Sequence, residues 1–137
     1  IILAITGAGG AFGAILKSSP MGDFLGNTMS GWNRGIFLPF IIAAALKTAQ
    51  GSSTVAIITT SSIMAPLMGT LGLSPALVVL AIGAGAMTVS HANDSYFWVV
   101  SQFSDMEVPV AYRTYTTATL LEGLVSIIVV ALLSLFV

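Results

Sequence analysis

Apolar residues gather in long blocks along this chain, and short polar segments separate the blocks. The blocks cover residues 1–16, 35–48, 54–68, 75–89 and 114–137. An apolar stretch of about 20 residues crosses a roughly 30 Å hydrocarbon core when it forms a helix. The pattern therefore predicts an all-α membrane protein, in which transmembrane helices accompany shorter, interrupted apolar segments.

The first and last blocks predict the two ends of this membrane region. Residues 1–17 are rich in glycine and are expected to form the end of a membrane helix, followed by a polar loop over residues 18–34. A second polar loop is expected over residues 102–113. Residues 114–137 contain one charge, Glu122, and are the clearest full span, so they are predicted to be the last transmembrane helix.

The two middle blocks are each too short to cross a membrane. Residues 35–48 would reach only about 21 Å as a helix, and the polar patch 49–53 separates them from residues 54–68. A single broken crossing and a re-entrant hairpin over residues 35–68 both fit this pattern. The hairpin is favoured because the two arms together are too long for one crossing. Its irregular tip would have to be buried in protein or face water.

Residues 75–103 form a second interrupted element, a broken helix. Ser74 and Pro75 are typical of a helix start, since serine caps a helix and proline suits its first position. The helix is expected to run to about Val89, where the polar segment 90–95 favours a break. Small residues share one face of this helix and would let a neighbouring membrane helix approach closely. They are Ala81, Ala84, Gly85 and Thr88.

Composition supports a lipid environment and excludes several classes of protein. Only 7% of the 137 residues are charged and 56% are hydrophobic, whereas about 25% are charged in soluble domains. A soluble domain, a nucleic-acid binder and a disordered tail are all disfavoured. The chain has no cysteine and one histidine, so thiolate metal sites are excluded and no metal or organic cofactor is expected.

Two interrupted apolar elements are typical of the binding site of a secondary transporter. Half-helix N-termini face an anionic substrate there, and freed carbonyl groups hold cations. The segment that would open the second hairpin arm is Gly51, Ser52, Ser53 and Thr54. Its free N–H groups and hydroxyls would cradle a carboxylate, and Gln50 would bind a substrate hydroxyl. A plain turn, capped by serine and threonine, is the alternative.

Three titratable residues are candidates for coupling transport to a proton. Asp94 is the most informative charge, because an aspartate at a membrane-helix centre costs about 2.5–3.5 kcal/mol and usually marks an ion path. His91 lies three residues earlier and could exchange protons near neutral pH, or it could serve only helix packing. Glu122 is expected near mid-depth of the last helix, where it carries a proton or pairs with a basic group elsewhere.

The remaining polar residues near the two interruptions leave their roles open. Asn93 could bind substrate or stabilise the break, and Ser95 is a further candidate for substrate binding. Lys47, just before the hairpin tip, could attract an anion or neutralise a nearby carboxylate.

A soluble enzyme is the alternative that the glycine-rich segment 6–13 raises. This segment resembles the glycine-rich turn of short-chain dehydrogenases. However, Ala11 occupies a position where that motif needs glycine, and Thr119 stands where a Tyr-x-x-x-Lys motif from Tyr115 would need lysine. Together with the hydropathy, these departures favour a membrane transporter that is not an enzyme.

Three segments of the chain resemble the gluconate permease (GntP) family, in the same order. They are Ile5–Gly13, Ala44–Ala56 and Ser90–Trp98. Glu122 also falls where that family often carries glutamate. The sequence departs from the family pattern at Ala92, where a larger residue is usual, and at Tyr96, where glycine is common. Since family members are about three times as long, the resemblance implies that this chain is their C-terminal third.

The resemblance implies a proton-coupled symporter for gluconate or a related small hydroxylated carboxylate. It also implies a multi-pass protein of the bacterial inner membrane with the fold of the ion transporter superfamily, in which this chain is the second of two inverted repeats. Sodium coupling, or D-serine and other sugar acids as substrates, are the alternatives within transport. A non-transporting scaffold subunit is the alternative outside it. The expected partners are the organic anion, lipid, the N-terminal part of the permease and a second copy in a homodimer. Nucleic acid is not expected as a partner.

Overall fold

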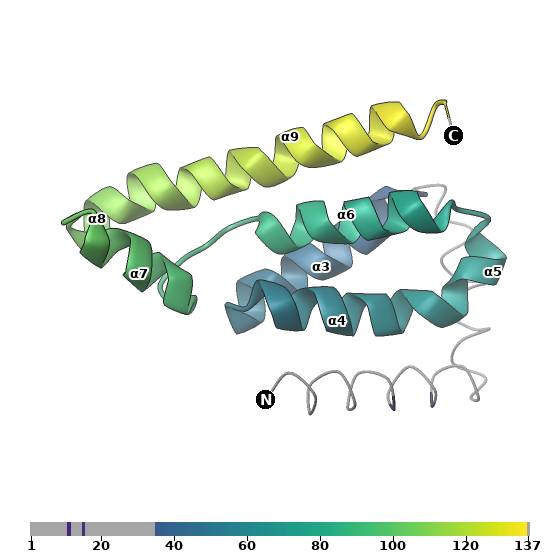
Figure 1. Cartoon of the computed structure of the whole chain (residues 1–137), viewed down its shortest axis with the longest axis horizontal. Helices are drawn as coiled ribbons and strands as arrows, with labels where there is room; N and C mark the ends of the chain where they lie inside the picture. The colour runs from purple at the N-terminus through teal and green to yellow at the C-terminus, as the bar shows by residue number, and fades with distance from the viewer. Residues whose placement is uncertain (1–10, 12–14, 16–34, 137) are drawn as a thin grey trace.

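The computed structural model describes Ala11, Ile15 and residues 35–136. The membrane-helix end predicted over residues 1–17 and the loop over residues 18–34 lie outside these residues, apart from Ala11 and Ile15. Every regular element in the described part is a helix, and these helices form an elongated bundle (Figure 1). The all-helical class predicted for the chain is therefore confirmed for the described residues.

The first two helices of the described part form a hairpin with a two-residue turn. Helix α3 (Phe37–Gln50) and helix α4 (Ser53–Met64) lie side by side and run in opposite directions (Figure 1). Gly51 ends α3 in the left-handed conformation (φ +68°), and its N–H donates to Lys47 O at 2.8 Å. Ser52 then caps α4, because its Oγ accepts from Val55 N at 3.3 Å. The re-entrant position of this hairpin in a membrane stays a prediction.

The second arm of the hairpin is longer than the sequence indicates. Instead of ending at residue 68, the arm continues from α4 through the 3₁₀ turn η1 (Ala65–Leu67) into the short helix α5 (Met68–Leu71). Pro66 does not end this helical arm, because it stands at the start of η1, where its missing N–H is not needed. Gly72 ends α5 with a φ of +62°.

Helix α6 (Pro75–Met87) is the central helix, and it packs against both α3 and α9 (Thr117–Leu133). All four small residues of its predicted close-packing face are buried. A Cβ added to Gly85 would lie 2.3 Å from Phe40 O, and one added to Gly123 would lie 2.1 Å from Thr88 Cγ2. Glycine therefore allows α6 to approach both neighbours at backbone contact, as the small face predicts.

The apolar core lies on two sides of α6. One cluster joins α6 to α9 and the start of α3: Ile36, Leu77, Ala81, Ala84, Ile127 and Val130. The other joins α6 to the hairpin: Ala43, Met64, Leu67, Val78 and Ile82. Because α6 contributes to both clusters, it fixes the hairpin relative to the last helix.

The broken helix is interrupted between α6 and α7 (Ser95–Phe103). Helix α6 ends at Met87, two residues before its predicted end at Val89. Val89 has a φ of +43°, a conformation that a β-branched residue adopts at a cost. The chain stays irregular over residues 88–94, and Asp94 then caps α7.

The last helix begins earlier than residue 114, so the predicted boundary is wrong. Helix α7 continues to Phe103, and a new helix starts at Val108, which leaves only residues 104–107 as loop. Pro109 explains the early start, because proline suits the first turn of a helix. Elements α8 (Val108–Ala111), η2 (Tyr112–Thr116, a π-helix) and α9 then follow without a gap.

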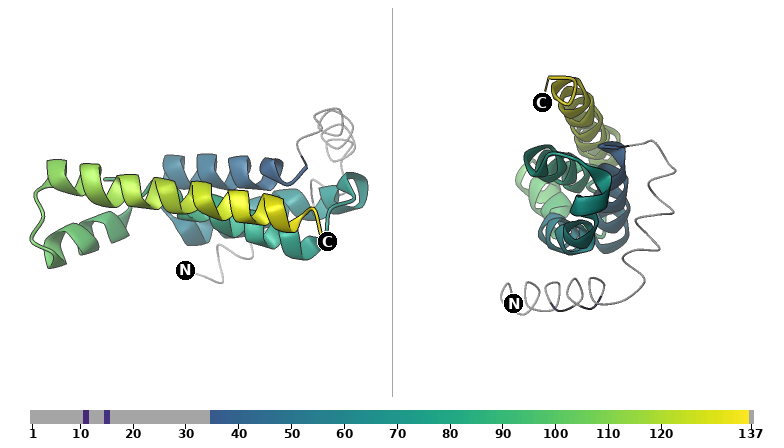
Figure 2. Two further views of the ribbon diagram at one scale, coloured as in Figure 1. Left: turned by 90° about the horizontal axis from the view of Figure 1, so that it is seen from above. Right: turned by 90° about the vertical axis from the view of Figure 1, so that its right-hand side faces the viewer.

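This continuous helix is the one candidate membrane span in the described part, by length and composition. Residues 108–133 number 26 and have a mean hydropathy of 2.1, and at 1.5 Å per residue they extend roughly 39 Å. Figure 2 shows α9 along the outer side of the bundle, where large apolar side chains are exposed. They include Leu121, Val125, Ile128 and Leu132.

Candidate functional site

A polar cavity of about 380 Å³ lies where the hairpin tip, the break after α6 and the start of α9 meet. Its volume falls within the range of small-molecule sites, about 300–1,000 Å³. The residues that line it are Lys47, Gly51, Ser52, Ser53, Thr54, Met87, Ser90, Asp94, Ser95, Tyr96, Tyr115, Thr119 and Glu122. The cavity therefore brings together both polar interruptions of the sequence and the glutamate of the last helix.

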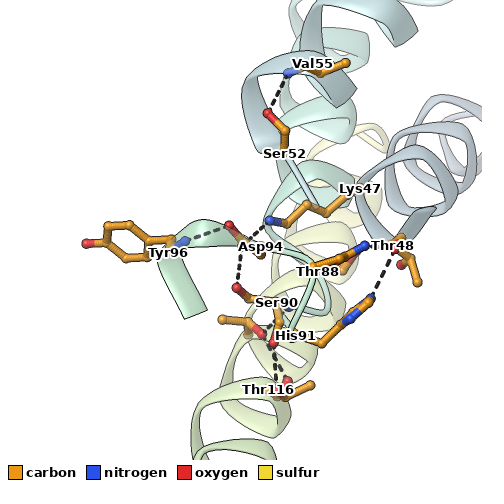
Figure 3. Close-up of polar contacts among 12 residues, drawn as sticks. Lys47, Thr48, Ser52, Val55, Thr88, Ser90, His91, Asp94, Tyr96 and Thr116 are labelled. Carbon is orange, nitrogen blue, oxygen red and sulfur yellow. Dashed lines mark hydrogen bonds and ion pairs between the residues drawn. The ribbon is translucent and has the colours of Figure 1, made fainter. Parts of the chain in front are cut away.

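The central feature of the cavity is an ion pair between Lys47 and Asp94. Lys47 Nζ lies 2.5 Å from Asp94 Oδ2, and the two side chains are 3% and 9% exposed. Ser90 Oγ also donates to Oδ2, while Oδ1 accepts from Tyr96 N at 2.9 Å. Figure 3 shows Lys47 and Ser90 pointing toward Asp94 from two sides. Of the two roles left open for Lys47, the structure shows the neutralisation of a carboxylate.

The hairpin tip supplies hydroxyls and N–H groups to one wall of the cavity. Gly51, Ser52, Ser53 and Thr54 all line it. The first N–H groups of a helix have no partner within that helix, so Ser53 and Thr54 offer both N–H and O–H donors at the start of α4. Gln50 is exposed and is not among the lining residues. The tip is also a capped turn, since Ser52 caps α4, and substrate binding by this segment stays a prediction.

Asn93 and His91 contact the end of α3 and do not line the cavity. Asn93 Nδ2 donates to Thr48 O at 2.9 Å and to Ala49 O at 3.4 Å. His91 Nε2 lies 3.1 Å from Thr48 O. Carbonyl groups at a helix C-terminus lack partners within the helix, and these two side chains satisfy them. The structure therefore places both residues where they join the break to the hairpin.

The far wall of the cavity comes from η2 and α9. Tyr115, Thr119 and Glu122 follow one another at helical spacing and line it together. Thr119 Oγ1 accepts from Ser90 N at 3.0 Å, and Thr116 Oγ1 donates to Ser90 O at 2.7 Å. These bonds hold the break against the last helix. A π-helical segment beside the cavity is consistent with a functional site, where such segments are frequent.

Several lining residues were not among the candidates from the sequence. Ser90, Tyr115 and Thr119 form part of the wall, together with Tyr96 and Met87. A helical signal existed for two of them, because Tyr115 and Thr119 precede Glu122 by seven and three residues on the same helix face.

Aromatic side chains contact the irregular segment between α6 and α7. Phe97 is fully buried, and its ring centroid lies 5.5 Å from that of Trp98 and 5.1 Å from that of Tyr112. Trp98 Nε1 donates to Ala92 O at 2.8 Å, and Ala92 N donates to Tyr112 OH at 3.3 Å. The irregular backbone next to Asp94 is therefore fixed by specific contacts.

The arrangement suits a small, hydroxylated ligand. Six hydroxyl-bearing side chains besides the tyrosines line the cavity, together with one cation and two carboxylates: Ser52, Ser53, Thr54, Ser90, Ser95, Thr119, Lys47, Asp94 and Glu122. Among the described residues, no three His, Asp or Glu side chains gather as metal ligands.

Comparison with known proteins identifies the family. Residues 1–136 match the sequence model of a protein family, and that family is described as "GntP family permease". The chain belongs to the GntP permease family. As a member of a permease family, it is a membrane protein.

The relatives of this GntP chain carry the names of permeases and transporters. It is 38% identical over 136 residues to the gluconate permease of Pseudomonas aeruginosa, covering 98% of this chain and 30% of the relative. It is also 38% identical over 138 residues to the D-serine transporter DsdX of Escherichia coli, covering 99% and 31%. The Gnt-II system L-idonate transporter of Escherichia coli is 37% identical over 128 residues, covering 93% and 28%. This GntP chain thus spans about 30% of the length of its curated relatives. No solved structure matches it.

Proposed function

We propose that the whole protein is a secondary active transporter that takes up gluconate or a related small hydroxylated carboxylate together with protons. The observation that carries this proposal is the polar cavity at the meeting point of two interrupted helical elements, in a chain of the GntP permease family. Irregular backbone of this kind, at half-helix ends, is typical of the substrate sites of secondary transporters. We propose a multi-pass protein of the bacterial inner membrane, in which this chain is one of two inverted repeats.

The substrate class follows from chemistry that the relatives' named substrates share. Gluconate, L-idonate and D-serine are the substrates in the names of three relatives, and each combines a carboxylate with at least one hydroxyl. The cavity offers hydroxyl groups to the hydroxyls and the N-terminal donors of α4 to the carboxylate. We assign substrate contacts to Ser52, Ser53 and Thr54 at the tip and to Ser95 at the break.

Proton coupling is assigned to the carboxylates of the cavity. Asp94 and Glu122 line it, whereas His91 does not. Asp94 and Glu122 are therefore better placed than His91 to exchange a proton while substrate is bound.

Transport is tested with the full-length protein reconstituted in vesicles. We expect uphill gluconate uptake when the outside is acidic, and loss of that uptake when a protonophore is added. Uptake that requires a sodium gradient and ignores the protonophore would contradict proton coupling. Ligands are first ranked by a thermal-shift screen of sugar acids and D-serine, since a bound ligand raises the unfolding temperature.

A site variant separates a transporter from a scaffold subunit. Thr54→Val removes a hydroxyl that lines the cavity but keeps the side-chain shape, and Thr59→Val on the same helix is the matched control outside the cavity. Losing one hydrogen bond should weaken substrate binding roughly 2- to 10-fold for Thr54→Val, with no change for Thr59→Val. Wild-type protein with no affinity for any of these ligands would contradict the proposed substrate class.

A further inference from the structure

The ion pair of Lys47 and Asp94 stands in the wall of the cavity that the substrate is proposed to occupy. Lys47 is the one cationic side chain that lines it among the described residues, and it is almost fully buried. Lys47 belongs to the last turn of α3, next to the tip that starts α4. An anion in the cavity would therefore meet a lysine whose charge Asp94 already neutralises.

The charges that line the cavity do not favour an added anion as they stand. Lys47 contributes one positive charge, and Asp94 and Glu122 contribute two negative charges, so the formal sum is −1. A carboxylate ligand would bring the sum to −2. Charges taken out of water need close compensation, and Lys47 is the cation that the described residues place in this wall.

We propose that Lys47 receives the carboxylate of the substrate, and that Asp94 is the internal competitor which the substrate displaces. This inference rests on the proposed function, and it names the cation of the same site. The N–H groups at the start of α4 line the same cavity and would hold the second oxygen of the substrate carboxylate. In the structure, Asp94 thus occupies the position on Lys47 that the substrate carboxylate would take.

Asp94 keeps two hydrogen-bond partners when Lys47 moves to the substrate carboxylate. The hydroxyl of Ser90 and the N–H of Tyr96 both donate to its carboxylate and do not depend on Lys47. Asp94 also remains the N-cap of α7. The exchange therefore needs no unfolding of the break.

The exchange leaves Asp94 without its counter-ion, and a proton taken up by Asp94 returns the formal sum from −2 to −1. Among the described residues, the titratable groups that line the cavity with Asp94 are Lys47 of α3, Tyr96 of α7, Tyr115 of η2 and Glu122 of α9, while the side chains that α4 contributes carry hydroxyls. His91 shares the break but contacts Thr48 O outside the cavity. Binding of the anion and binding of the proton would thus be linked in one site.

The test measures gluconate affinity for the purified full-length protein and three variants at one pH. Asp94→Asn removes the competitor, while the Asn side chain still accepts from Tyr96 N–H and caps α7. We expect this variant to bind gluconate as tightly as wild type or more tightly. Lys47→Gln should bind on the order of tenfold or more weakly, because a hydrogen bond to a charged group is lost. The double variant should bind as weakly as Lys47→Gln.

A purely structural ion pair gives the opposite result. In that case Asp94→Asn weakens binding as much as Lys47→Gln does, and the double variant recovers wild-type affinity, which would overturn the proposal. If Lys47→Gln fails to fold because Asp94 is left unpaired, the double variant lacks both charges and still decides the question. Wild-type protein that binds none of the sugar acids refutes the proposed function itself, which is a distinguishable outcome.

Proton linkage is measured in a weakly buffered solution. We expect wild type to take up about one proton from solution for each gluconate bound, and Asp94→Asn to take up none. Asp105→Asn is the matched control, because Asp105 is exposed in the loop after α7 and does not line the cavity. This variant should retain the uptake, and uptake that persists in Asp94→Asn would contradict the assignment to Asp94.

Discussion

Asp94 holds two elements together through a single side chain. One oxygen caps α7, and the other receives Lys47 and Ser90. The aspartate was singled out from sequence because a charge within an apolar segment is costly. Its partner could not be named, because Lys47 lies 47 residues earlier and only the hairpin turn brings it near. The cost of one charge is visible in a sequence, whereas the pairing of two depends on tertiary structure.

The positions of Asn93 and His91 show a second limit at the residue scale. Both stand beside Asp94 in the sequence, yet they face the carbonyl groups of α3 and not the cavity. An irregular segment has no fixed periodicity, so the direction of each side chain follows from its backbone conformation. Val89, with its φ of +43°, lies at the start of that segment.

Tyr96 is expected to restrict the size of the substrate. It lines the cavity at the start of α7, and only its backbone N–H is used by Asp94. Tyr96→Gly should therefore enlarge the cavity and raise the affinity for a six-carbon sugar acid relative to D-serine several-fold. Competition binding with the full-length protein measures that ratio. Tyr96→Phe serves as the control for the hydroxyl, and an equal shift in both variants would rule out size as the cause.

At the scale of elements, the hairpin tip and the break are in backbone contact. A Cβ on Gly51 would lie only 2.2 Å from Asn93 O, and Asn93 in turn binds the carbonyl groups before the tip. The two interruptions therefore form one unit, in which neither can change its backbone conformation without disturbing the other.

Replacement of Gly51 tests this unit. Gly51→Ala should lower the free energy of unfolding by at least about 2 kcal/mol, because it adds a clash with Asn93 to the cost of a left-handed residue. Gly72→Ala is the matched control, since Gly72 has a similar φ of +62° and a Cβ there would meet no described residue within 4 Å. It should cost only about 1–2 kcal/mol. Thermal unfolding of the full-length protein in detergent compares the two variants. An equal loss of stability in both would show that the close approach to Asn93 does not contribute to the cost.

The boundaries of elements were predictable where a local signal sets them. Ser74 and Pro75 indicate the start of α6, and the structure agrees. Proline often marks the end of a helix or a loop, yet Pro66 and Pro109 each stand in the first turn of a helical element. The same residue type starts or stops a helix according to its position, and that position depends on the neighbouring turn.

At the scale of the whole molecule, α6 is the helix through which the hairpin and the last helix are joined. Gly85 of α6 and Gly123 of α9 permit this, because an added Cβ at either position would clash with the neighbouring helix. The small face was visible at helical spacing. The identity of its two neighbours was not, since a face of this kind fits any close helix.

A disulfide bond between residue 88, at the end of α6, and residue 123 of α9 tests how closely the two helices approach. A Cβ on Gly123 would lie 3.2 Å from Thr88 Cβ, slightly less than the roughly 3.5–4.5 Å between the Cβ atoms of a disulfide, so the helices need to move apart only slightly for the bond to form. This chain has no cysteine, so the variant Thr88→Cys/Gly123→Cys adds one pair to it. We expect nearly complete loss of free thiols after mild oxidation, measured by labelling of the unfolded full-length protein in which other cysteines are replaced.

The control pair is Gly83→Cys with Gly123→Cys. A Cβ at Gly83 would have no neighbour within 4 Å among the described residues, so a cysteine thiol at this position should remain free. Cross-linking of both pairs to the same extent would contradict the close approach of α6 and α9.

The distance in sequence between Lys47 and Asp94 has a consequence for biosynthesis. A ribosome adds about 5–20 residues per second, so Lys47 emerges roughly 2–10 s before its counter-ion. During that interval the hairpin carries an isolated ammonium group, which is costly in a bilayer. We expect the hairpin to wait at the membrane surface until Asp94 has been synthesised, and to enter the protein interior only when the two charges can enter as a pair.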